Sequence, residues 1–266
     1  MNSRVLHRIL SIDTSAPVLH AAVLGEGGGF TEISRDVSGS HSGELTEAME
    51  SLLRQAEVPL EELEAVVVGS GPGSFTGLRI GFGFAKGLAL GLDIPLVRHS
   101  SLEAWAFEHR APGHLIISLA AGGGPNSAVA AMYWCGEGSR LETVRDAAIV
   151  TEVSFGESIE EEIERRRIPT LKVLFTGPAF VTIRSGPREG ILPFISDLTH
   201  KFPPPRSSSR VARSLIELFI LQGAVARSND ARERIAALSL ISPDYVIPVA
   251  AKTIEERREA AGKGGS

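Results

Sequence analysis

The sequence has little sulfur and no metal-binding spacing of histidines. Cys135 is its one cysteine, which excludes a disulfide-stapled scaffold and a cysteine-rich zinc site. A lone thiol fits a reducing compartment, and we interpret it as a buried, inert group. The seven histidines form no HxxxH or HExxH pair, so the zinc pattern of metallopeptidases is missing. No metal site is predicted.

Long apolar runs are also missing. No window reaches the 18 or more apolar residues of a membrane span, and Asp13 interrupts the first apolar run after a few residues. The chain is nevertheless 43% hydrophobic and 22% charged, with a mean hydropathy of +0.09, so it can bury a sizeable core. We expect a cytoplasmic protein of about two domains, without a secretory leader or a membrane segment.

Positive charge is scarce overall but concentrated in one segment. The net charge is −5, which argues against a protein that binds nucleic acid strongly by itself. Residues 163–213, however, hold ten Lys and Arg against three Asp and Glu, a local net charge of +7. Two interpretations remain open: a solvated surface of a small domain, or a basic patch that contributes to an assembly on RNA.

The first hundred residues predict three strands followed by alternating helices and strands. Apolar β-type runs at residues 8–12, 18–24 and 30–37 are separated by turns, and an amphipathic helix follows. A strand at 65–68, a helix at 75–92, a strand at 94–97 and a helix at 101–109 complete the order βββαβαβα. This order predicts a mixed five-stranded sheet with helices on its faces, the ribonuclease-H-like half-domain of the actin, Hsp70 and sugar-kinase superfamily.

The second half of the sequence suggests a degenerate repeat of the first. Paired strands are predicted at 114–120 and 128–134, a helix at 157–167, and a strand at 171–175 that ends in Thr176-Gly-Pro178. A helix at 208–221 is expected to pack back on the first half. We therefore predict an N-terminal domain at 1–110, a second domain at 111–254 and a disordered tail at 255–266.

The glycine-rich segment at residues 69–77 joins a predicted strand to a predicted helix. Such a turn directs backbone N–H groups at one point, which suits a phosphate. No Gly-Lys-Ser/Thr closes it, and Thr76 stands where a dinucleotide motif needs its third glycine. The candidate nucleotide-binding residues are Asp13, Thr14, Gly71, Gly73 and Ser74. The alternative is a tight turn without a ligand, with Asp13 capping a hairpin.

The predicted helix at 75–92 contains five glycines, three of which fall on one strip. Small residues in a strip let another helix approach closely, so this strip predicts either close packing on its own sheet or a subunit interface. The preceding helix carries an apolar stripe that we assign to the same interface. The candidate interface residues are Leu45, Met49, Leu52, Ala56, Gly83, Gly87 and Gly91.

Several motifs together resemble the TsaB (YeaZ) family. They include Ile9-Leu-Ser-Ile-Asp-Thr-Ser15, Gly71-Pro-Gly-Ser-Phe-Thr-Gly-Leu-Arg-Ile-Gly81 and Ala85-Lys-Gly-Leu-Ala89. The resemblance is strong over residues 9–108 and thins beyond them. It implies a non-catalytic subunit that dimerises with the TsaD transferase and is required for threonylcarbamoyladenosine formation on tRNA next to the anticodon. A TsaE-like ATPase, a homodimer, contact with tRNA only through the complex, and ATP or ADP at the partner interface are further implications.

The same resemblance bears on catalysis. The metal-binding histidine positions of the TsaD sister family fall at Ser101 and Trp105, neither of which is a good metal ligand. We therefore predict no catalytic residues. A small-molecule kinase or ATPase of the actin-like superfamily is the alternative function, with Asp13 and residues 71–77 around the phosphates. A metallopeptidase is excluded by the histidine spacing.

Overall fold

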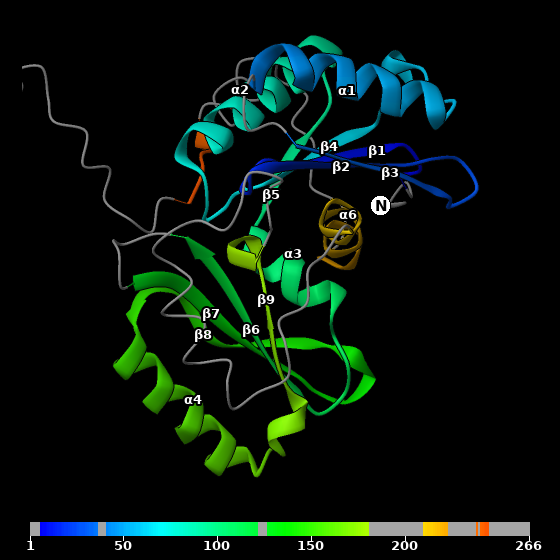
Figure 1. The fold of residues 1–266 in the computed structure, drawn as a ribbon. Helices are drawn as coiled ribbons and strands as arrows, with labels where there is room; N and C mark the ends of the chain where they lie inside the picture. Colours follow the sequence, from blue (N-terminus) through cyan, green and yellow to red (C-terminus); the bar gives the residue numbers. More distant parts are fainter. Residues whose placement is uncertain are drawn as a thin grey trace, which may run out of the picture.

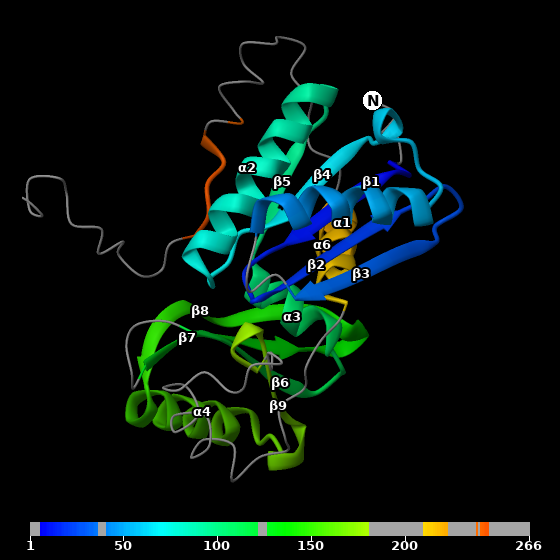
Figure 2. The same ribbon diagram turned by 45° about the horizontal axis from the view of Figure 1, so that its top comes forward.

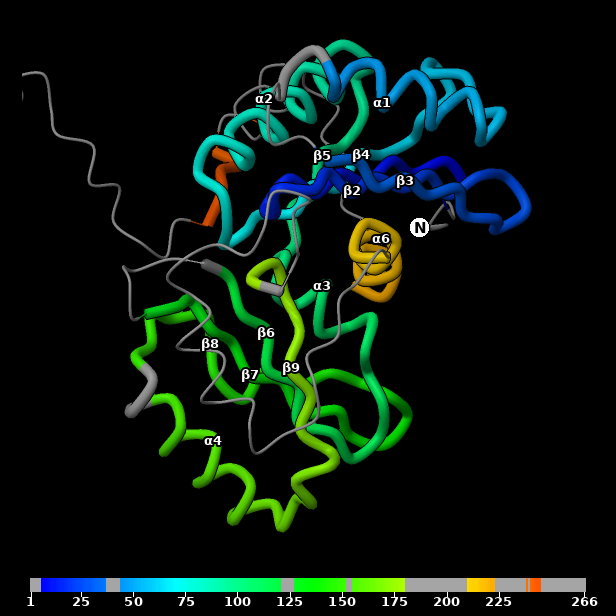
Figure 3. The backbone as a smooth tube through the Cα atoms, in the orientation of Figure 1, coloured from blue at the N-terminus to red at the C-terminus, as the bar shows by residue number. Residues whose placement is uncertain are grey.

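The structure is a computed structural model that describes residues 6–36, 41–121, 127–180, 210–222, 238 and 240–244. Its strands form two sheets, one above the other, with helices on the outside and between them (Figure 1). The chain traces the first sheet before it enters the second, as the tube in Figure 3 makes easy to follow. None of the described helices is long and apolar enough to cross a membrane.

The first sheet has the predicted ribonuclease-H-like order. Its strands are β1 (Ile9–Asp13), β2 (Val18–Leu24), β3 (Phe30–Asp36), β4 (Ala65–Gly69) and β5 (Leu96–His99). They lie in the order β3-β2-β1-β4-β5; the first three are antiparallel, while β4 runs parallel to β1 and to β5. β1 and β4 are buried along their whole length and lie side by side in the interior of the sheet.

Helices cover both faces of this sheet. On one face lie α1 (His41–Gln55) and α2 (Phe75–Leu92), and on the other lie α3 (Ser101–Glu108) and α6 (Val211–Gln222) (Figures 1 and 2). Successive side chains of a strand point to opposite faces. Leu10 and Ile12 of β1 therefore pack with α1, whereas Ile9 packs with α6.

The second sheet repeats the first four strands of the first. It consists of β6 (His114–Ala121), β7 (Ser127–Cys135), β8 (Leu141–Thr151) and β9 (Val173–Thr176), in the order β8-β7-β6-β9. Helix α4 (Glu152–Arg166) packs on it. The sequence patterns missed β8, because this edge strand is largely solvent-accessible and its first six residues are mostly polar. Helix α4 also begins five residues before its predicted start.

Helix α3 lies between the two sheets. Leu102 and Ala106 pack against the second sheet, while Ala104 and Trp105 pack with α6 and the first sheet. Helix α6 lies on the first sheet, as expected for the predicted helix at 208–221, and the Ser11 hydroxyl donates a hydrogen bond to the Ala212 carbonyl at 2.6 Å. The domain limits remain predictions, and the predicted tail at 255–266 lies outside the described residues.

Three carboxylates gather where β3, α3 and α6 meet. They belong to Glu32, Glu108 and Glu217, and Arg213 donates to Glu217 at 2.8 Å. Burial raises the pKa of Glu108 to about 7, against the opposing effect of Arg210. Burial likewise raises the pKa of Glu32, against the opposing effect of Arg213. Ionising Glu108 therefore costs more free energy in the folded state than in the unfolded chain.

We predict that Glu108→Gln makes the protein more stable than the wild type at neutral and higher pH but not near pH 4.5. The pKa of Glu108 rises from its ordinary 4.5 to about 7 on folding, so the folded state holds a proton that the unfolded chain releases in this range. Wild-type stability is thus lost as pH rises through the window, by roughly 1–2 kcal/mol after allowing for solvent screening at this partly exposed site. Urea unfolding should show equal stability of variant and wild type near pH 4.5 and a more stable variant at pH 8. The control is Glu50→Gln on exposed α1; a difference that does not change with pH would contradict this account.

Candidate functional site

A buried carboxylate ends the first strand. Asp13 is fully buried, and its Oδ1 accepts hydrogen bonds from the Ser15 N–H at 2.9 Å and the Ser15 hydroxyl at 2.6 Å. Its Oδ2 accepts from the hydroxyl of Ser101, the first residue of α3, at 2.6 Å. Three donors from two elements thus satisfy a group that is costly to bury unpaired.

Glycines allow the turn at residues 13–15 to lie directly against β4 and α2. A Cβ added at Gly69 would lie 1.9 Å from Asp13 Oδ2, and one at Gly73 would lie 2.2 Å from the Ser15 carbonyl oxygen. Along α2, a Cβ at Gly77 would lie 2.3 Å from the Thr14 carbonyl oxygen. These distances are too short for any side chain, so glycine is required at these three positions.

The structure brings the predicted nucleotide-binding residues together but also uses their polar groups internally. The Gly71 N–H donates to Ser101 Oγ at 3.0 Å, and the Ser74 N–H donates to the Ser15 carbonyl at 2.7 Å. The Thr14 hydroxyl donates to the Gly77 carbonyl at 2.8 Å. Gly73 is the close-approach position described above. This geometry favours the tight-turn interpretation, and nucleotide binding stays a prediction.

A row of polar side chains, which the sequence analysis did not single out, crosses the first sheet beside Asp13. Strand register places Asp13 opposite His20, His20 opposite Ser34, and Gly69 opposite His99. His20 Nδ1 lies 2.9 Å from Ser34 Oγ. Burial lowers the pKa of His20, against the opposing effect of Asp13, and burial also lowers the pKa of His99. Both imidazoles are therefore biased toward the neutral form. The row could have been found in the sequence by aligning the predicted neighbouring strands and comparing the residues that face the same side of the sheet.

Ser101 and Trp105 are completely buried one helical turn apart on α3. The Trp105 indole meets the His20 ring edge-on, with centroids 5.7 Å apart and an interplanar angle of 87°. An indole carries no lone pair for a metal, and the Ser101 hydroxyl is bonded to Asp13. Among the described residues, no three His, Cys, Asp or Glu side chains gather into a group that would hold a metal ion.

The predicted interface residues divide into two groups. Leu45, Met49 and Leu52 are buried, packed with Ala56 against the chain's own first sheet, so the structure corrects their assignment to a partner-facing stripe. The amphipathic pattern indicated a core face. The strip Gly83, Gly87 and Gly91 instead faces outward, since a Cβ added at any of them meets nothing within 4 Å.

The basic segment is partly neutralised where the structure describes it. Arg165 and Arg166 both donate to Glu162, at 2.7 and 3.0 Å, and Arg166 also lies over the Trp134 ring. Residues 181–209 lie outside the described residues, so the two interpretations of this segment stay open. Cys135 is buried as expected, and burial raises the pKa of its thiol, which makes it a poor nucleophile.

Comparison with known proteins places the chain in a family. The family model for tRNA N6-adenosine threonylcarbamoyltransferase, TsaD, matches residues 27–241, which is most of the sequence. The chain belongs to this TsaD-related family. Within it, the resemblance to TsaB is confirmed: the Bacillus subtilis tRNA threonylcarbamoyladenosine biosynthesis protein TsaB is 42% identical over 102 residues, 38% of this chain and 44% of that protein.

Other members of the family match over a similar length. TsaB of Escherichia coli K12 is 35% identical over 37% of this chain and 42% of its own. A tRNA N6-adenosine threonylcarbamoyltransferase of Nitratidesulfovibrio vulgaris is 41% identical over 39% of this chain and 26% of its own. The chain thus matches less than half of the length of these relatives.

Two solved structures show the same fold. A Pseudomonas aeruginosa protein described as similar to the peptidase YEAZ superposes with a TM-score of 0.64 at 20% identity, covering 91% of this chain and all of that one. YeaZ from the same organism gives 0.59 at 19% identity, covering 86% and 98%. At these identities the likeness confirms the two-sheet TsaB/YeaZ fold.

The inward and outward glycines of α2 predict opposite responses to alanine. Gly77→Ala places a methyl group against the Thr14 backbone and should destabilise the protein by about 1–3 kcal/mol. Gly87→Ala meets no neighbour and should stabilise the helix by up to about 1 kcal/mol. Chemical denaturation of the two variants beside wild type measures both changes, and equal effects at the two positions would contradict the described packing.

Proposed function

We propose that this chain is a TsaB-like subunit that supports threonylcarbamoyladenosine formation on tRNA without supplying the chemistry. The observation that carries the proposal is the filling of the site at the end of β1. Asp13 is bonded to Ser15 and Ser101, and Trp105 fills the next turn of α3 beside His20. Ser101 and Trp105, which stand where the TsaD sister family has its metal-binding histidines, thus belong to the core of this chain. Its membership of the family supplies the pathway.

The outer face of α2 is the surface that we assign to a TsaD-like partner. Phe75 and Leu90 are 37% and 55% exposed, and the strip of Gly83, Gly87 and Gly91 lies along the same helix. The Arg79 guanidinium lies 3.9 Å from the centre of the Phe75 ring. Arginine and aromatic residues are enriched among the residues that dominate binding energy at interfaces. Such a face suits a helix that approaches closely.

Further partners follow from the same proposal. A TsaE-like ATPase and tRNA would join through the complex, and ATP or ADP would bind at the partner interface. Without the partner, the same face of α2 would allow a homodimer, because a two-fold interface uses one patch twice. A small-molecule kinase or ATPase remains the competing function, and titration of the isolated chain with ATP and Mg²⁺ distinguishes the two by whether turnover occurs.

The purified chain alone should be inactive in threonylcarbamoyl transfer. Because Ser101 and Trp105 are poor ligands and are committed to internal contacts, we expect no stoichiometric iron or zinc by elemental analysis and no transfer from threonylcarbamoyl-adenylate to tRNA. Activity should appear when the TsaD-like protein of the same organism is added. One bound metal per chain, or turnover without the partner, would refute the non-catalytic assignment.

Gly87→Leu should weaken partner binding without unfolding the subunit. A Cβ added at Gly87 meets no described atom within 4 Å, and leucine has a higher helix propensity than glycine, so the thermal midpoint should be maintained or raised. At a closely packed interface the same side chain should cost about 1–3 kcal/mol, a loss of roughly 5- to 150-fold in affinity. Titration calorimetry with the TsaD-like protein measures this loss. Gly29→Leu, at an equally open glycine in the turn before β3, is the matched control; normal binding by Gly87→Leu would show that the interface lies elsewhere.

A further inference from the structure

A short segment far along the chain lies beside the start of α2. Residues 240–244, which we call the strap, pass next to the amino-terminal end of this helix (orange in Figures 1 and 2). Ile241 packs on the cluster that Val66, Val68 and Leu96 form with the inner side of α2. The strap therefore covers the edge of the first sheet at β5.

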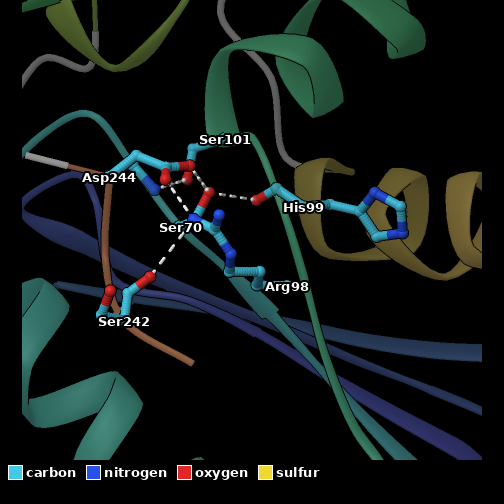
Figure 4. A network of polar contacts seen from close by, with 7 residues as sticks. Ser70, Arg98, His99, Ser101, Ser242 and Asp244 are labelled. Atoms are coloured by element: carbon cyan, nitrogen blue, oxygen red, sulfur yellow. Dashed lines mark hydrogen bonds and ion pairs between the residues drawn. The ribbon is translucent and has the colours of Figure 1, made fainter. Parts of the chain in front are cut away.

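A polar clip attaches the strap to the carboxyl ends of β4 and β5 (Figure 4). The Asp244 N–H donates to the Ser70 carbonyl at 2.8 Å, and the Ser70 hydroxyl donates to the Asp244 carboxylate. The Arg98 guanidinium pairs with the other Asp244 oxygen and donates to the Ser242 carbonyl at 3.3 Å. One aspartate thus connects the strap to two neighbouring strands.

The clip holds the residue from which the glycine turn begins. Ser70 follows β4 directly, and its N–H donates to the His99 carbonyl at 2.7 Å. The next residue, Gly71, exchanges hydrogen bonds with Ser101 through both its N–H and its carbonyl. Asp244 is therefore connected through Ser70 to the turn that positions Phe75 and the rest of α2.

Few of the contacts that hold the strap are deeply buried: Ile241 is half-buried, and the ion pair of the clip lies at the surface. The side chains of Arg98 and Asp244 are 44% and 42% exposed, and exposed ion pairs contribute little to stability. Leu240 is 82% exposed and contributes little burial. Segments with few buried contacts open more readily than the global fold. The strap thus has the contacts of a segment that detaches locally while both sheets stay folded.

We propose that residues 240–244 form a detachable strap whose clipped state holds the glycine turn and presents the outer face of α2 to the partner subunit. This proposal rests on the proposed function, because it takes the TsaD-like protein as the partner. In the clipped state, Asp244 fixes Ser70 and thereby the start of α2. If partner binding favours the clipped state, linkage requires that clipping favours partner binding by the same factor.

The test compares three variants of the full chain by hydrogen–deuterium exchange and by affinity for the TsaD-like protein. Asp244→Ala removes both side-chain bonds and should speed exchange at least threefold in the strap and in residues 69–78, and weaken partner binding five- to tenfold. Asp244→Asn keeps an acceptor for Ser70 but loses the charge pair with Arg98, so it should fall between. Ser242→Ala is the control, because Ser242 contributes its backbone carbonyl and should match wild type.

The outcomes separate the strap from the function. Unchanged exchange in Asp244→Ala would overturn the clip, and faster exchange with unchanged affinity would overturn its coupling to the partner. If the wild-type chain itself does not bind the TsaD-like protein, the proposed function fails, while the exchange comparison still decides whether Asp244 holds the strap. Bound partner should, conversely, slow exchange of the strap in the wild type and not in Asp244→Ala.

Discussion

The arrangement of the first half depends on the hydrogen bonds that allow the Asp13 carboxylate to be buried. Ser15 and Ser101 supply the hydrogen bonds, and Gly69 supplies the space, since any side chain there would overlap Oδ2. Ser101 in turn bonds to Gly71, so α3, the glycine turn and the end of β1 form one connected unit. Because an unpaired buried acceptor is costly, each of these groups constrains the others.

Much of this fold was predictable because its signals are local and periodic. The unbroken apolar run of β4 indicated a central strand, and glycine at residues 69–77 indicated a strand-to-helix turn. Strand β8 could not be predicted, since an exposed edge strand is stabilised by pairing with β7 rather than by an apolar pattern. The site itself was harder. The sequence motifs assigned Asp13 and Gly71 to one candidate site. Only the fold shows that Ser101, from a helix much later in the sequence, donates a hydrogen bond to the Asp13 carboxylate.

The error over α1 has a physical lesson. Leu45, Met49 and Leu52 form an apolar stripe at helical spacing. A helix that covers a sheet needs such a stripe for its own packing, so the stripe is not free to bind a partner. An amphipathic pattern therefore identifies a buried face without saying what buries it. The glycine strip of α2 carries different information, because glycine adds no apolar surface and faces the core only where another part of the chain approaches the helix closely, as at Gly77 and Gly81.

Helix α2 uses its glycines in two ways, and the difference is the strongest physical argument for a partner. Gly77 and Gly81 lie against the Thr14 backbone and hydroxyl, where a Cβ would be only 2.3 Å away, so close packing within the chain compensates for their lower helix propensity. Gly83, Gly87 and Gly91 meet nothing within 4 Å. Each weakens the helix by about 1 kcal/mol relative to alanine, up to about 3 kcal/mol together, with no contact among the described residues to offset it. Under the proposed function, the compensating gain for this face comes from a partner surface that approaches the α2 backbone more closely than alanine would allow.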